Sequence, residues 1–177
     1  FNVATFNDVV SSIPDVVTRP ITQPGYAGMK KTQEYVNKAY DRARGLAAGF
    51  RLDTQAVDEL KSLKDMADTL PKDEAARFAK FYNNYVGNKF RTGGITSDGY
   101  KTLDSQLGRI VKQTNQKEVG LAFKELRSLL QNAASRQNPE MAKALKEADL
   151  AFAKLRTVEN AVGRGDKASG QFTPGQL

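Results

Sequence analysis

The chain contains no cysteine and no histidine among its 177 residues, and no tryptophan. Without cysteine there is no disulfide, no thiolate nucleophile and no zinc–thiolate site. Without histidine the chain lacks the usual transition-metal ligand and the side chain best suited to proton transfer near neutral pH. Catalysis would have to depend on carboxylates, lysine, tyrosine, serine or threonine. We therefore expect no enzyme, no cofactor and no metal site.

Long apolar runs are also missing. The longest span only a few residues, such as Leu46-Ala47-Ala48, whereas a helix that crosses a bilayer needs about 20. The N-terminus has no basic stretch followed by an apolar one, so we expect no signal peptide and no transmembrane segment. Because the chain begins with Phe1 and stops at Leu177, we expect it to be a fragment or a processed product of a longer protein.

Basic residues outnumber acidic ones. Hydrophobic residues make up 40% and charged residues 27% of the chain, as in a globular protein. Lysine and arginine total 27 against 20 aspartates and glutamates, a net charge of +7. This surplus favours a polyanionic partner, either nucleic acid or an anionic membrane face. Because the charges are interspersed, a basic surface that is merely soluble is an equal alternative.

Apolar residues recur every three or four positions from Met29 onward, which predicts about six amphipathic helices. Short loops between helices make neighbours antiparallel, so we expect an all-α fold, either an up-and-down bundle or an elongated stack of helical hairpins. The expected helices cover roughly 29–50, 54–70, 71–89, 97–111, 119–133 and 139–162.

Several helix boundaries carry recognisable signals. Gly49 can end the first of these helices, and Asp53 or Thr54 can cap the next one. Thr96 follows two glycines and is a suitable cap. The clearest boundary is Asn138-Pro139-Glu140, which combines a capping side chain, a first-turn proline and an acid.

The two ends of the chain differ from its middle. Pro14, Pro20 and Pro24 interrupt residues 1–28, so we predict an extended N-terminal arm there, with at most a short helix around 5–11. The apolar residues of this arm can pack on its own bundle or on a partner. Residues 29–163 are predicted to form one helical bundle domain, and glycines mark 164–177 as a flexible Gly-rich C-terminal tail.

Acidic pairs are the first requirement of an enzyme without histidine. Asp58-Glu59 precedes lysines at helical spacing, and Asp73-Glu74 follows Pro71 at a helix start. Both patterns are typical of exposed ion pairs and of acids that complement a helix dipole. No pair is singled out as a general acid and base, so we predict no catalytic residues.

Cations interleave with aromatic residues from Phe78 to Tyr100, and further cations follow on the next two predicted helices. A cationic groove with stacking rings is typical of single-stranded nucleic-acid sites, but aromatic residues at helical spacing more often form a core. The candidate contacts for non-specific phosphate binding are Lys80, Lys89, Arg91, Lys101, Arg109, Lys112, Lys117, Lys124 and Arg127. The candidate assembly contacts in the arm are Ile13, Val16, Val17 and Ile21.

The last third of the chain resembles virion-associated proteins of tailed phages, of the internal, DNA-transfer or ejection type. The resemblance covers about residues 75–177. It depends on the helix that begins at Asn138-Pro139, on Glu159-Asn160-Ala161 and, above all, on the Phe172-Thr173-Pro174 motif that precedes Leu177. It implies no catalytic residues.

This resemblance implies a non-enzymatic structural component of a tailed-phage virion, associated with genome ejection or with capsid or tail assembly. Its partners would be other virion proteins or copies of itself, with DNA contacted through phosphates. It would reside in the virion, and in the host cytoplasm during assembly. The alternative hypothesis is a sequence-independent nucleic-acid-binding helical module.

Overall fold

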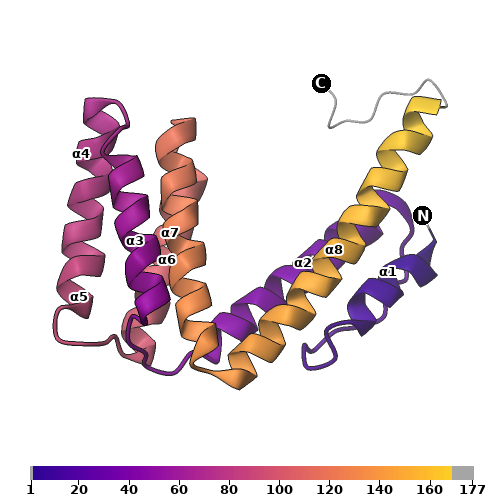
Figure 1. The fold of residues 1–177 in the computed structure, drawn as a ribbon. Coiled ribbons are helices and arrows are strands. Elements are labelled where there is room, and N and C mark those ends of the chain that lie inside the picture. Colours follow the sequence, from indigo (N-terminus) through magenta and orange to yellow (C-terminus); the bar gives the residue numbers. More distant parts are fainter. Residues whose placement is uncertain (1, 169–177) are drawn as a thin grey trace. The chain divides into compact units, whose positions relative to one another are not determined.

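The computed structural model describes residues 2–168, and this part of the chain is all-α, as predicted (Figure 1). In chain order its elements are α1 (Val3–Ser11), α2 (Gly25–Gly45), α3 (Thr54–Ala67), α4 (Lys72–Phe81), the π-helical segment η1 (Tyr82–Gly87), α5 (Asn88–Phe90), α6 (Ser97–Gln113), α7 (Lys117–Arg136) and α8 (Pro139–Ala168). None of the described helices combines the length and the apolar character needed to cross a bilayer.

The helices form two compact units. Unit 1 comprises Phe1–Ala43 and Ala142–Leu177, and unit 2 comprises Arg44–Met141. The prediction of one bundle over 29–163 is therefore wrong. The apolar stripes of α2 and α8 pack against α1 and the arm, and these elements share a core of their own.

Unit 1 is built on the apolar face of α1. Asn2 caps this helix by accepting a hydrogen bond from the backbone of Thr5 at 2.9 Å. Its apolar side chains at three- and four-residue spacing then meet α2 and α8. The buried core consists of Phe6, Val9, Val10, Ile13, Ile21, Tyr35, Val36, Ala39, Ala148, Ala151, Leu155 and Val158.

Helix α1 occupies the place where the sequence allowed a short helix, and the predicted extended arm over 1–28 requires correction at its other end, where α2 begins at Gly25. Residues 12–24 fold back onto the core, where the Asn7 amide donates to the Ile21 carbonyl at 3.1 Å and accepts from the Ile21 backbone N–H at 2.9 Å. Helix α2 starts at Gly25, directly after Pro24. Position 28 of this helix requires glycine, because the Phe6 ring lies 2.7 Å from where a Cβ atom would stand.

Unit 2 is a four-helix arrangement in which α7 packs against α3, α4 and α6 (Figure 1). Helix α4 continues through η1 into α5, and Val86 is buried within the π-helical turn. A π-helical turn inserts an extra residue into a helix and so changes which side chains face the core. The largest buried side chains of the unit are Phe78, Tyr100, Leu103, Leu107, Phe123, Leu126, Leu130 and Met141.

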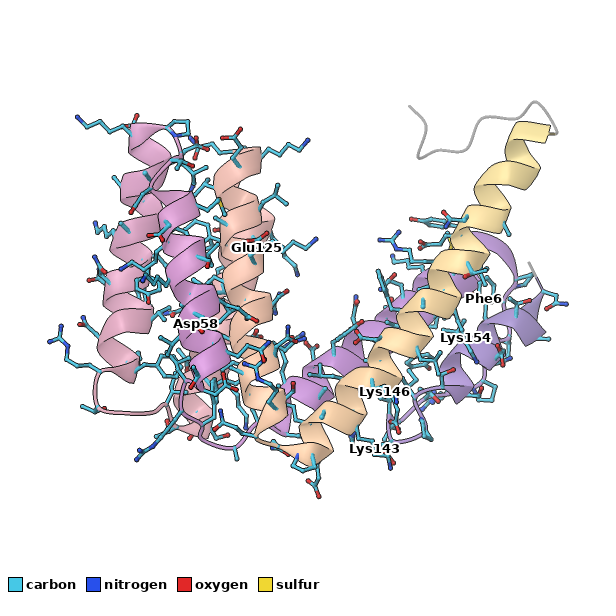
Figure 2. The ribbon with its side chains drawn as sticks, in the orientation of Figure 1. Phe6, Asp58, Glu125, Lys143, Lys146 and Lys154 are labelled. Atoms are coloured by element: carbon cyan, nitrogen blue, oxygen red, sulfur yellow. The ribbon has the colours of Figure 1, made fainter. Side chains whose placement is uncertain are left out.

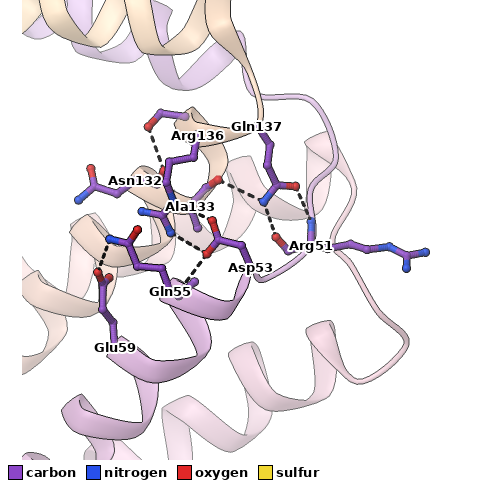
Figure 3. Close-up of polar contacts among 10 residues, drawn as sticks. Arg51, Asp53, Gln55, Glu59, Asn132, Ala133, Arg136 and Gln137 are labelled. Carbon is purple, nitrogen blue, oxygen red and sulfur yellow. Dashed lines mark hydrogen bonds and ion pairs between the residues drawn. The ribbon is translucent and has the colours of Figure 1, made fainter.

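Three predicted caps are present. Asp53 caps α3 by accepting from the Ala56 N–H at 2.8 Å, and the same carboxylate receives two 2.7 Å hydrogen bonds from Arg136 at the end of α7 (Figure 3). Thr96 caps α6 at 3.1 Å, and the Asn138 side chain accepts from the backbone of Met141 at 3.2 Å.

Helix α2 ends four residues before Gly49, where the sequence indicated its end. Phe50 lies beyond the helix and is still buried. Its backbone exchanges hydrogen bonds of 3.0 and 2.9 Å with Ile95. This long-range pairing replaces the helical bonds that the local pattern predicted.

The predicted flexible tail over 164–177 also requires correction, since α8 continues to Ala168. The rest of that predicted tail, 169–177, lies outside the described residues.

Candidate polyanion-binding pocket

An open pocket of about 490 Å³ lies in unit 1 between α2 and the arm. Helix α2 lines it with Ala27 and with Gly28, Lys31, Tyr35 and Lys38, the last four at steps of three and four that place them on one helical face. The arm lines it with seven consecutive residues: Val17, Thr18, Arg19, Pro20, Ile21, Thr22 and Gln23.

Three of the twelve lining residues are cationic and none is acidic. The ammonium groups of Lys31 and Lys38 lie 5.4 and 5.5 Å from the centre of the Tyr35 ring, within the range of cation–π attraction. Arg19 supplies the third cation from the arm. The chain has 20 acidic residues, yet the charged residues that line this pocket are all cations. Such a pocket attracts anions.

Lys31 also pairs with Glu34 at 2.8 Å. The hydrogen bond that Lys31 donates to that carboxylate raises the pKa of Lys31. Both side chains are about half exposed, and such surface pairs contribute little to stability. Lys31 can therefore exchange Glu34 for a phosphate at little cost.

Tyr35 links the two walls of the pocket. Its hydroxyl oxygen accepts a hydrogen bond from the Arg19 backbone N–H at 2.9 Å, which fixes the arm against α2. Thr18, Thr22 and Gln23 add neutral hydrogen-bond donors to the lining. The arrangement can hold a phosphate group by charge and hydrogen bonds.

The sequence-predicted phosphate contacts all lie in unit 2, where they are spread over α4, α5, α6, α7 and the loop that follows α5. Eight of the nine are exposed. Lys101 and Lys112 are eleven residues apart on α6, about 16 Å along its axis.

Arg127 does not fit its predicted role as a DNA contact. Its guanidinium binds the buried carboxylate of Asp104 at 2.9 and 3.1 Å, and Arg44 reaches the same carboxylate at 3.1 Å. A guanidinium held in this way stabilises the helix pair α6 and α7.

The aromatic residues of 78–100 mainly serve the core of unit 2. The rings of Phe78 and Phe81 lie 5.3 and 5.4 Å from Phe123, and Tyr100 lies 5.3 Å from Phe50. Phe50, Phe78, Phe81, Tyr100 and Phe123 are all buried, so these five rings offer no platform on which bases could stack.

The predicted assembly contacts in the arm differ in their burial. Ile13 and Ile21 are buried in the core of unit 1, and Val16 packs against that core. The prediction that Ile13 and Ile21 contact a partner is wrong, because the arm folds onto its own unit. Val17 is 91% exposed, at the rim of the pocket.

Arg19, Lys31 and Lys38 were not among the sequence-predicted contacts. The seven-residue step from Lys31 to Lys38 places both on one face of a helix and could have identified that pair. The sequence does not indicate that Arg19 lies near these two lysines, because it is the fold of the arm that brings Arg19 to the pocket.

Within the described part of the chain, no three acidic side chains come together as a metal site. Comparisons with protein-family models, curated proteins and solved structures found no match to this chain.

Proposed function

We propose that this chain is a non-enzymatic helical protein that binds nucleic acid through its phosphates, without reading the bases, as a structural component of a tailed-phage virion. The observation that supports nucleic-acid binding is the pocket of unit 1, with three cations and no acid in its lining. The resemblance of residues 75–177 to phage virion proteins supports the virion role.

Phosphate contacts release counterions from nucleic acid, so affinity depends steeply on salt and not on sequence. A single phosphate group can lie between Lys31 and Lys38 while Arg19 reaches it from the arm. Tyr26 is 76% exposed and directly precedes the pocket residue Ala27. A ring in this position favours single strands, whose bases are free to stack.

The test compares two triple variants of equal charge. Arg19→Gln, Lys31→Gln and Lys38→Gln remove the pocket cations, while Arg91→Gln, Lys80→Gln and Lys89→Gln remove three exposed cations of unit 2. Binding to a fluorescent oligonucleotide is titrated between 50 and 200 mM salt, and circular dichroism verifies that both variants are folded.

We expect the pocket variant to bind at least tenfold more weakly and to lower the slope of log K against log salt by about 2 to 3. The unit 2 variant is expected to change both quantities much less. A larger loss in the unit 2 variant would place the phosphate contacts on unit 2 and contradict the pocket. No binding by the unaltered chain at 50 mM salt would refute the nucleic-acid function itself.

The virion role has its own test. We expect mass spectrometry of purified particles of a phage that encodes this chain to detect its peptides in stoichiometric amounts. Their absence from particles, with the protein present in the infected cell, would overturn the virion assignment and leave the nucleic-acid-binding module as the surviving function.

A further inference from the structure

Unit 2 carries a second surface, a groove of about 760 Å³ between α3 and α7. Its floor includes the buried side chains Leu63 and Leu129. Its walls include Met66 and Leu121, which are 38% and 51% exposed. Apolar side chains of this size at the surface of a groove favour a contact that covers them.

The polar residues of the groove have the opposite charge to the chain as a whole. Asp58, Glu59 and Glu125 line it against the single cation Lys124, in a chain whose net charge is +7. Among the described residues, neither Asp58 nor Glu125 makes a hydrogen bond or an ion pair. Asp58 lies on α3 and Glu125 on α7, so the acids border the groove on both sides (Figure 2).

Helix α8 presents a face of matching chemistry. Lys143, Lys146 and Leu150 follow one another at steps of three and four, so they share one side of the helix. Figure 2 labels the two lysines on α8. Leu150 is 53% exposed. Lys154 continues the same face, although it also pairs with Asp8 at 3.2 Å.

We propose that the groove between α3 and α7 binds the Lys143–Leu150 face of α8 from a second copy of this chain. Leu150 would lie on the apolar walls at Leu121 and Met66, while the two lysines pair with Asp58 and Glu125. An amphipathic helix in an apolar groove is a recurring mode of recognition, and opposite charges at its rim fix the register.

Such a contact joins two different surfaces, so it is heterologous and leaves one groove and one α8 face free for the next copy. Heterologous contacts generate rings when the rotation closes and filaments when it does not. The inference rests on the proposed structural role, and it supplies the self-association that such a role requires. It makes no use of the pocket of unit 1.

Charge reversal on each surface provides the test. One variant carries Asp58→Lys and Glu125→Lys, and a second carries Lys143→Glu and Lys146→Glu. A control with Lys72→Glu and Lys89→Glu alters the net charge as much as the second variant, on residues outside both surfaces. Sedimentation velocity without nucleic acid measures the mass of each across protein concentration.

We expect the unaltered chain and the control to self-associate, and each reversed variant alone to do so at least tenfold more weakly. An equimolar mixture of the two reversed variants is expected to regain association, because each groove then meets an α8 face of opposite charge. A monomeric unaltered chain, or a mixture that stays monomeric, would overturn the proposal. Oligonucleotide binding by the unaltered chain separates the two ideas, since an unaltered chain that stays monomeric but binds the oligonucleotide refutes only the groove contact.

Discussion

Arg127 on α7 holds Asp104 on α6 through two hydrogen bonds, from Nε to Oδ1 at 2.9 Å and from the second terminal nitrogen to Oδ2 at 3.1 Å. Arg44 approaches Oδ2 at 3.1 Å, and the carboxylate side chain is only 6% exposed. Gly108, one turn after Asp104, leaves room for the guanidinium, which lies 3.0 Å from where a Cβ would stand. A buried carboxylate is thus neutralised by two cations from different segments.

Replacing Arg127 by Gln should lower the free energy of unfolding by about 2 kcal/mol, because hydrogen bonds to a buried charge are lost. Lys124→Gln, on the same helix and exposed, should change it by less than about 0.5 kcal/mol. Urea titrations measure both values. Equal stability of the two variants would mean that the Asp104 pair contributes nothing, and that Arg127 is free to serve elsewhere.

Gly28→Ala should lower the free energy of unfolding by about 1 to 3 kcal/mol, since the added methyl meets the Phe6 ring and the Gln23 carbonyl. Gly45→Ala is the matched control, because a Cβ there meets nothing within 4 Å. That control should stabilise α2 by up to about 1 kcal/mol. Thermal unfolding monitored by circular dichroism compares the two, and the opposite order would contradict the packing of α1 on α2.

Asp53 makes the free energy of unfolding depend on pH in the acidic range. The hydrogen bonds from Arg136, followed by the one from the Ala56 backbone, lower the pKa of Asp53 to about 2. Its stabilisation is therefore present above the unfolded pKa, near 3.8, and is lost as the pH falls through the folded pKa. Asp53→Asn should cost about 1 kcal/mol at pH 7 and only a fraction of that at pH 2, where the folded carboxylate is half protonated. Urea unfolding at the two pH values measures this, and a cost that does not change with pH would contradict the pairing.

Tyr100 has a buried hydroxyl that makes no hydrogen bond within the described part of the chain. Burial, followed by the charge of Asp104, raises the pKa of Tyr100. The folded state favours the neutral phenol, so its stabilisation is complete below the unfolded pKa near 10 and declines as the pH rises beyond it. Tyr100→Phe should raise stability at pH 7 by about 1 kcal/mol and reduce the loss above pH 10. Chemical denaturation at pH 7 and pH 11 measures both. A destabilised variant at pH 7 would show that the hydroxyl has a partner.

The predictable part of this fold is the part governed by local chemistry. Asp53, Thr96 and Asn138 cap helices as the sequence indicated, because a cap depends on residues three positions away. The stripe of α7 is buried from Val119 to Ala133, because helical periodicity selects the core face.

What could not be predicted depends on contacts between distant segments. No local pattern indicates that the backbone of Phe50 pairs with that of Ile95. Nor does any indicate that Arg127 binds the buried Asp104 instead of extending into solvent like the other predicted phosphate contacts. The pocket depends on such contacts too: Arg19 lies there because Asn7 binds the backbone of Ile21 and the Tyr35 hydroxyl binds the backbone of Arg19. The division into two units was missed because the apolar stripes of α2 and α8 do not reveal which other helices they meet.

Unit 1 is assembled from the two flanks of unit 2, and this sets an order for folding on the ribosome. All of Arg44–Met141 is synthesised before the α8 residues that complete the other core. Asp8 can form its ion pair only after Lys154, 146 positions later, has been synthesised. Until then Phe6, Ile13 and Ile21 have only α2 to cover them. We expect the nascent N-terminal segment to be the part of this protein most exposed to chaperones and to aggregation during translation.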